Sequence, residues 1–232
     1  MRQSRVFSLA AASLLLVSGA ALAQNNDPPP SGAILDLNGL PIPHNAAQQY
    51  TVDFMAGVAN TAITFAFRDD PGYISFSDAS VINLTAGSGN LLTNGDFSGG
   101  TYTSSGNAYT PVGWAYANIY GASYGGGISS SCGVNGGNCW SDGAVQAYDA
   151  ISQTIATTPG DSYQISFYVQ EGSGQTDFSR LSTNGQGGTN GNGVDVLAYA
   201  QAGLPPADVP EPASLTLLAS GLIGLGAARR RR

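Results

Sequence analysis

The sequence predicts an all-β protein, an antiparallel β-sandwich of the jelly-roll type, between two apolar terminal segments. Apolar residues alternate with a period of two in many short stretches, turn signals separate these stretches, and no stretch between the ends has a helical apolar stripe. The 232 residues include 32 glycines, and only 10% of the chain is charged, against about 25% in ordinary soluble domains. We expect half-buried strands whose outer faces carry Ser, Thr, Asn and Gln instead of charge.

The predicted strands begin near residue 48. Alternating apolar side chains mark the first two: Tyr50, Val52 and Phe54, then Ile63, Phe65 and Phe67. Further strands are expected at 74–76, 80–84, 144–148, 151–156, 163–169 and 194–200, with turns at 70–72, 94–96 and 159–161. The Gly-rich stretches 99–143 and 185–193 are expected to be long loops or flexible insertions.

The first 23 residues are typical of a secretory signal peptide. Arg2 and Arg5 precede an apolar run at 7–17, and Ala21-Leu22-Ala23 is an A-x-A-type cleavage site. The alternative is a permanent membrane anchor, although the run is short for a bilayer span of roughly 20 residues. Residues 24–47 then form a linker that begins Pro-rich.

The C-terminal segment, residues 205–232, combines three elements in a fixed order. Pro210-Glu211-Pro212 is followed by an apolar stretch at 213–228 and by Arg229, Arg230, Arg231 and Arg232. This order resembles the PEP-CTERM sorting signal of Gram-negative bacteria. The resemblance implies an exosortase-type sorting enzyme as partner, transient membrane insertion through a helix at 213–228, and a final place at the cell surface or in the extracellular matrix. An ordinary tail anchor is the alternative, and it leaves the Pro-Glu-Pro motif unexplained.

Charge excludes several classes of protein. The chain has no lysine, and six of its eight arginines lie at the two ends. Residues 24–209 hold 14 acidic and two basic residues, a net charge of −12. Such a body lacks the basic face that a nucleic-acid partner requires, and it opposes binding to anionic lipid.

The body also resembles a known kind of domain, but in an unusual order. Residues 90–97 (NLLTNGDF), Gly113-Trp114 and the strands at 152–167 and 192–197 resemble galactose-binding-like, carbohydrate-binding-module jelly rolls. The closing strands of that family resemble residues 61–81, which come first here. We therefore predict one circularly permuted domain at 48–204, with 48–84 supplying the closing strands and 90–204 the opening and middle strands. A truncated repeat beside an incomplete domain, or strand donation between two molecules, are the alternatives.

The two cysteines, Cys132 and Cys139, are separated by six residues, three of them glycine. In an exported chain a disulfide is the default expectation. Two cysteines and one histidine do not complete the usual four-ligand zinc site. We therefore expect no cofactor beyond the calcium considered below.

No catalytic constellation is found, so an enzyme is not expected. His44 is the single histidine, in a predicted solvated loop, and no G-x-S-x-G motif is present. Asp69 and Asp70 are adjacent, and neighbouring residues of a strand face opposite sides. Arg68, one of two internal arginines, is expected to pair with a nearby acid.

Two further sites complete the prediction. The jelly-roll resemblance implies a structural calcium, with Asp78 and Asp96 as oxygen donors. Aromatic residues crowd one Gly-rich stretch, where rings can stack on sugars. Trp114 is expected in the core, and the candidate ligand-binding residues are Tyr116, Tyr120, Tyr124 and Trp140.

The expected function is that of a non-catalytic surface or matrix protein that associates with exopolysaccharide or another surface glycan. A purely structural or adhesive protein without a specific ligand is one alternative, and a polysaccharide hydrolase is another.

Overall fold

The computed structural model describes residues 29–38, 40, 42–44, 46–70, 72–99, 102–105, 108–118, 122, 124–145, 147–171 and 193–202. The predicted signal peptide, most of the stretch 185–193 and the sorting segment lie outside the described residues. In the part of the chain that is described, no helix is long and apolar enough to cross a membrane.

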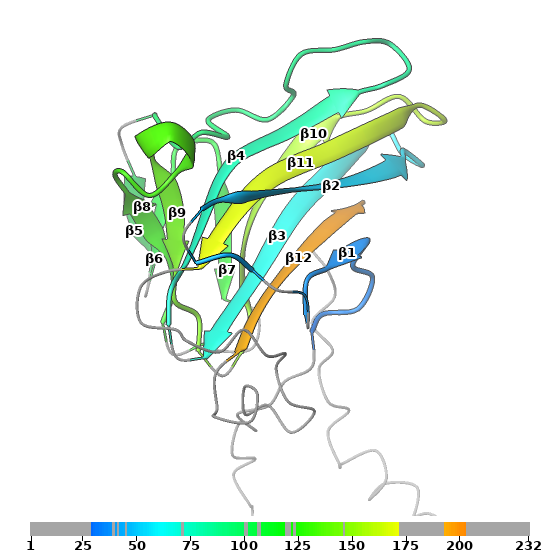
Figure 1. The fold of residues 1–232 in the computed structure, drawn as a ribbon. Helices are drawn as coiled ribbons and strands as arrows, with labels where there is room; N and C mark the ends of the chain where they lie inside the picture. The colour runs from blue at the N-terminus through cyan, green and yellow to red at the C-terminus, as the bar shows by residue number, and fades with distance from the viewer. Residues whose placement is uncertain are drawn as a thin grey trace, which may run out of the picture.

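Two five-stranded antiparallel sheets form a sandwich, as the sequence predicts (Figure 1). The first sheet has the order β1-β12-β3-β10-β7 and the second β2-β11-β4-β9-β8, and β5 and β6 form a separate ribbon. The strands are β1 (Leu35–Asp36), β2 (Gln48–Met55), β3 (Asn60–Asp70), β4 (Ile74–Asn83), β5 (Tyr102–Ser105), β6 (Ala108–Pro111), β7 (Ala115–Asn118), β8 (Gly127–Ser129), β9 (Cys139–Asp142), β10 (Asp149–Ala156), β11 (Ser162–Glu171) and β12 (Gly193–Gln201). The one described helix is a short 3₁₀ turn, η1 (Val134–Gly136).

Apolar side chains that point inward from the central strands build the core. The inward side chains of β3 are fully buried, as are those of β11. Phe65 of β3 meets Phe76 of β4 and Phe167 of β11 with ring centroids 4.7 and 5.3 Å apart. Trp114 is only 7% exposed and packs against the same cluster, which confirms the expectation that it is a core residue.

Residues 60–83 supply central strands to both sheets. β3 lies between β12 and β10, and β4 pairs with β11 and, at its start, with β9. The segment 90–95 runs along the open edge of β4, where the Leu91 N–H donates to the Val81 carbonyl at 2.8 Å. The early strands therefore pair with later ones within a single chain. The permuted order relative to a jelly-roll family stays a prediction, because no family relationship of the domain is established.

The Gly-rich stretch 99–143 contains more structure than expected. β5 to β9 all fall within it, so its expected loop character is wrong in part. The predicted strand at 144–148 is absent, and the strands expected at 74–76 and 80–84 are one strand, β4. The reason is that Gly, Ser and Tyr give no clear alternation of apolar and polar residues in the sequence. These segments become strands because they pair with neighbouring strands.

Candidate functional site

The predicted aromatic site does not form as a group. Trp140 on β9 is fully buried, and Gly126 lies so close that an added Cβ would come within 2.3 Å of the indole ring. Trp140 therefore has no face to offer a sugar, and its assignment as a ligand-binding residue is wrong. Tyr120 lies outside the described residues. Tyr124 alone of the candidates is well exposed, at 60%.

Tyr116 belongs to a buried acidic cluster that sequence reasoning did not find. Asp142 on β9 and Asp149 on β10 are both fully buried in the interior. Asp142 accepts hydrogen bonds from Trp140 Nε1 and from the Ala144 N–H, both at 2.9 Å. The two carboxyl groups and the half-buried Tyr116 face one another across the sandwich, although they come from strands of different sheets.

Burial sets the protonation of this cluster. It raises the pKa of Asp142 to about 6, against the opposing effect of the hydrogen bonds from the Ala144 N–H and Trp140 Nε1. It raises the pKa of Asp149 well above its usual value, and the adjacent charge of Asp142 adds to the rise. Burial, followed by the charges of Asp149 and Asp142, also raises the pKa of Tyr116. Two carboxylates this close do not both ionise, so the pair holds a proton.

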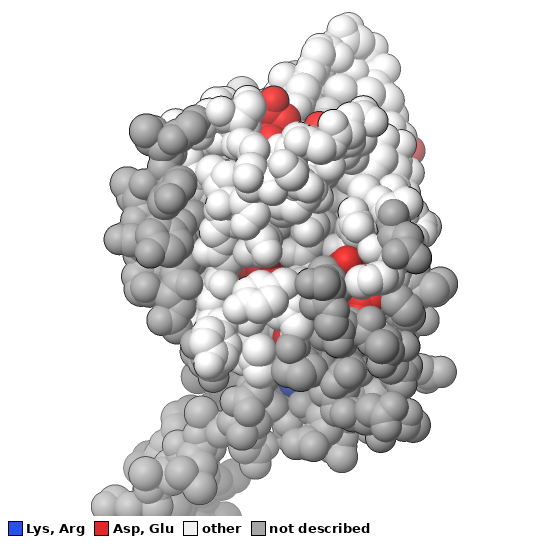
Figure 2. Space-filling view, turned by 60° about the vertical axis from the view of Figure 1, so that its left-hand side comes forward, with Lys and Arg blue, Asp and Glu red and all other residues white. Residues whose placement is uncertain are grey.

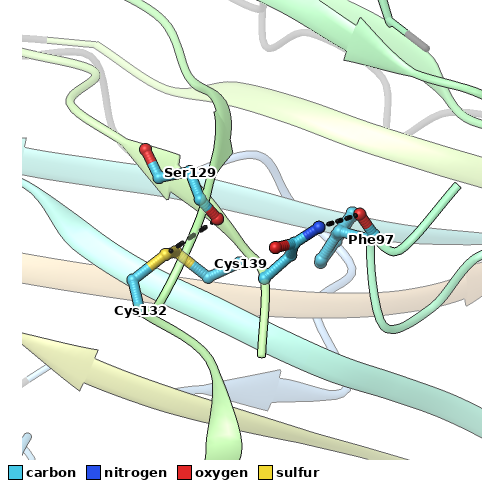
Figure 3. The surroundings of a disulfide bond; sticks show 5 residues. Phe97, Ser129, Cys132 and Cys139 are labelled. Atoms are coloured by element: carbon cyan, nitrogen blue, oxygen red, sulfur yellow. Dashed lines mark hydrogen bonds between the residues drawn. A yellow bond between two sulfur atoms is a disulfide. The ribbon is translucent and has the colours of Figure 1, made fainter. Parts of the chain in front are cut away.

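The disulfide between Cys132 and Cys139 forms as predicted, with Cα atoms 5.4 Å apart. It closes the loop that carries η1 onto the start of β9 (Figure 3). The Ser129 carbonyl oxygen lies 3.2 Å from Cys132 Sγ, a contact without a proton because the sulfur is oxidised. Asn138 Nδ2 donates to the Phe97 carbonyl at 2.9 Å, which ties the disulfide loop to the segment 90–99.

Asp78 and Asp96, the predicted calcium ligands, line one polar hollow of about 420 Å³. Asp78 sits at a bulge in β4, where the register with β11 shifts between Ser166 and Tyr168, and its φ is 51°. Gly95 approaches the bulge so closely that a Cβ there would lie 2.0 Å from the Ala79 carbonyl oxygen. The bulge and the close-packed glycine thus bring the two aspartates to one place.

The amide side chains that line the hollow already make hydrogen bonds within the protein. Asn90 Oδ1 accepts from the Val81 and Leu92 N–H groups, and its Nδ2 donates to the Ala79 carbonyl. Asn94 is likewise hydrogen-bonded at both side-chain atoms, to Val112 and Gly99. The side chains left to meet a ligand are Asp78, Ser80 and Asp96.

Asp96 is the more exposed of the two aspartates. Its Oδ1 accepts hydrogen bonds from the Ser98 N–H at 3.1 Å and from Ser98 Oγ at 2.9 Å. These bonds lower the pKa of Asp96, so the group is ionised at neutral pH. In the described part of the chain, no group of three or more His, Cys, Asp or Glu side chains is arranged to hold a metal.

His44 differs from its expected solvated setting, whereas Arg68 lies beside an acid, as expected. His44 is half-buried and lines a cavity with Glu171 at the end of β11. Arg68 is 2% exposed, opposite Asp195 in the β3–β12 register, with its guanidinium 5.9 Å from the Tyr148 ring centroid. Tyr148 Oη donates to Asp195 at 2.7 Å, so Arg68 belongs to an internal polar network.

The visible surface carries little charge. On the face in Figure 2, acidic side chains form small separate patches among uncharged residues. Arg68 is the one arginine or lysine among the described residues.

The fold and these sites define an acidic, disulfide-containing β-sandwich. Residues 208–232, beyond the sandwich, match the model of the PEP-CTERM protein-sorting motif. The match spans Pro210-Glu211-Pro212 and the four terminal arginines. The chain therefore carries the signal of an exported protein that an exosortase recognises and that is processed at the membrane. No match to the chain is found among curated proteins or among solved structures.

Proposed function

We propose that the exported chain is a non-catalytic surface or matrix protein that associates with exopolysaccharide or another surface glycan. The observation that carries the proposal is the joining of a sorting motif to a sandwich that exposes Tyr124 in a Gly-rich segment. An exposed tyrosine ring can stack on a sugar while neighbouring polar groups bond its hydroxyls. The low surface charge suits a hydroxyl-rich partner better than an ionic one.

A non-catalytic role is supported by the position of the acids. The close Asp142–Asp149 pair of carboxyl groups resembles a glycosidase dyad in composition, but both side chains are 0% exposed. A glycosidase needs its two carboxyl groups on either side of the scissile bond. A pair sealed in the sandwich interior does not meet a polymer.

The test compares two exposed tyrosines. Tyr124 is 60% exposed and Tyr73 is 53% exposed, so Tyr73→Ala is a matched control for Tyr124→Ala. We expect neutral polysaccharides to retain the purified chain and its Tyr73→Ala variant, and to retain Tyr124→Ala at least about fivefold less, equivalent to about 1 kcal/mol of stacking. Equal loss in both variants, or no retention at all, favours the purely structural role. Release of reducing sugar during the assay would establish a hydrolase instead.

We also propose that the hollow between Asp78 and Asp96 holds a structural calcium ion. The two carboxylates and the Ser80 hydroxyl are the hard oxygen donors that Ca²⁺ prefers, and the remaining positions fall to backbone carbonyls and water. Calcium there would cross-link the β4 bulge to the segment 90–96. The ion's part is therefore structural, and no chemistry is assigned to it.

Thermal unfolding with added calcium or with a chelator tests this site. We expect calcium to raise the Tm of the purified chain and the Asp78→Asn variant to lose that rise. Asp53→Asn, an acid on β2 outside the hollow, is the control and should keep it. A Tm that is the same with calcium and with chelator overturns the calcium proposal and leaves the glycan proposal untouched.

A further inference from the structure

A second cavity, distinct from the hollow at Asp78, lies where the end of β11 meets the disulfide loop. Its volume is about 340 Å³, at the lower end of the range of small-molecule sites. Its lining combines one acid, one imidazole, hydroxyl groups and an amide: His44, Ser75, Ser131, Cys132, Gly133, Gln170 and Glu171.

Glu171 is the unusual member of this lining. Its side chain is 2% exposed, and no described residue donates a hydrogen bond to either Oε1 or Oε2. A carboxyl group in this position loses its hydration without gaining a partner, which is costly. Burial raises the pKa of Glu171 to about 7, and the nearby His44 partly offsets that rise.

His44 is held beside Glu171 by backbone contacts. Gln170 Nε2 donates to the His44 carbonyl at 2.9 Å, and the Glu171 N–H donates to the Pro43 carbonyl at 3.0 Å. These bonds fix the segment 42–44 against the end of β11. Nδ1 of His44 is buried and is also without a hydrogen-bond partner among the described residues.

Three acceptor atoms without a partner therefore belong to side chains that line one small cavity: the two oxygens of Glu171 and, in the Nε2-protonated tautomer, Nδ1 of His44. When His44 is neutral, no described side chain supplies a positive charge to Glu171, because the one described arginine, Arg68, belongs to the Tyr148–Asp195 network. A cation from outside meets that need. A metal ion would find only two protein donors here, fewer than the three or four that zinc sites use.

We propose that the His44–Glu171 cavity binds a ligand that carries a primary ammonium group beside hydroxyl groups, as an amino sugar does. The three N–H donors of an ammonium group match the three acceptors, and the hydroxyls meet Ser75 and Ser131. Because both carboxylate oxygens are shielded from solvent, binding requires side chains of the cavity wall to turn aside. This site is separate from Tyr124 and does not depend on the glycan proposal.

Calorimetric titration of the purified full-length chain tests the proposal with four probes: glucosamine, methylammonium, glucose and N-acetylglucosamine. We expect saturable binding of the first two and none of the last two, because glucose lacks the amine and acetylation removes its charge. Glu171→Gln should weaken glucosamine binding at least tenfold. Asp53→Asn, which removes an acid on β2 outside both cavities, should leave it unchanged.

Glu171→Gln keeps the shape of the side chain, and an unaltered cooperative melt shows that it folds. His44→Gln is the second variant and should weaken glucosamine binding without abolishing it. Equal binding of glucosamine and glucose overturns the proposal, as does full binding by folded Glu171→Gln. Zinc binding that is lost in both variants, without any amine binding, overturns it in favour of a metal site.

Discussion

The buried Asp142–Asp149 pair makes the stability of this sandwich depend on pH in an unusual direction. Most acidic groups are more easily ionised in a folded protein, which then loses stability in acid. Here burial raises the pKa of both carboxyl groups, so the folded chain binds more protons than the unfolded chain. The free energy of unfolding from this pair is therefore largest below about pH 4 and falls as the pH rises.

The size of this pH-dependent change in stability can be worked out from the pKa of Asp142. Its pKa moves from 3.8 to about 6, which corresponds to on the order of 3 kcal/mol of stability lost as the pH rises through that window. Asp142 accepts two N–H hydrogen bonds, which favour its charged form, so the shared proton resides mainly on Asp149. Asp149 adds up to about 1.4 kcal/mol per pH unit over the range in which it keeps that proton.

The variant Asp149→Asn tests this reasoning, because an amide is neutral in both the folded and the unfolded chain. We expect the variant to gain stability relative to the native chain as the pH rises from about 4 to about 7. The measurement is urea unfolding across that pH range, with the difference in free energy plotted against pH. Each pH unit should widen the difference by up to about 1.4 kcal/mol.

Asp96→Asn is the matched control with the opposite sign. Hydrogen bonds from Ser98 lower the pKa of Asp96, so its contribution is present at neutral pH and is lost as the pH falls through the folded pKa. The control should lose a little stability near pH 7 and match the native chain in acid. A free-energy difference between native chain and Asp149→Asn that is constant over the whole range refutes the buried proton.

Three further predictions concern stability alone. Replacing Cys132 and Cys139 with serine should lower the free energy of unfolding by about 2.5 kcal/mol, the loop-entropy value for a ring of about eight residues, and reduced native protein should show the same loss in urea. Gly95→Ala should lower it by at least about 1–3 kcal/mol, because the new Cβ meets a backbone carbonyl of β4, whereas Gly89→Ala, with open space around it, should change little; equal effects in thermal melts would contradict the structure. Trp140→Ala should cost about 3–5 kcal/mol by denaturant titration, and a near-neutral result would mean that the indole is not in the core.

The alternation of apolar residues predicted the sandwich correctly because a strand's period is a local property. Ile63, Phe65 and Phe67 face the core between the two sheets, whereas Ala66 between them faces a second buried cluster on the other side of the strand. The disulfide was also predictable, because its ends are close in the chain. The Gly-rich surroundings of Trp140 led to the wrong prediction that it binds a ligand from a loop. Trp140 and Asp142 are two residues apart on β9, and this spacing already indicated that their side chains share one face of the strand.

The close pairs of ionisable groups could not be predicted. Asp142 and Asp149 come from different sheets and meet only across the interior, and His44 reaches Glu171 from a segment far earlier in the chain. Asp78 and Asp96 were named from a resemblance, and the β4 bulge brings them to one hollow.

The sequence by itself determined the sorting signal, the acidic charge and the all-β class, because each depends on residues that are neighbours in the chain. The tertiary structure alone decided which polar groups are buried together and which aromatic ring is exposed. The physical reason is that burial and electrostatic coupling depend on distance in space, which strand pairing across two sheets sets.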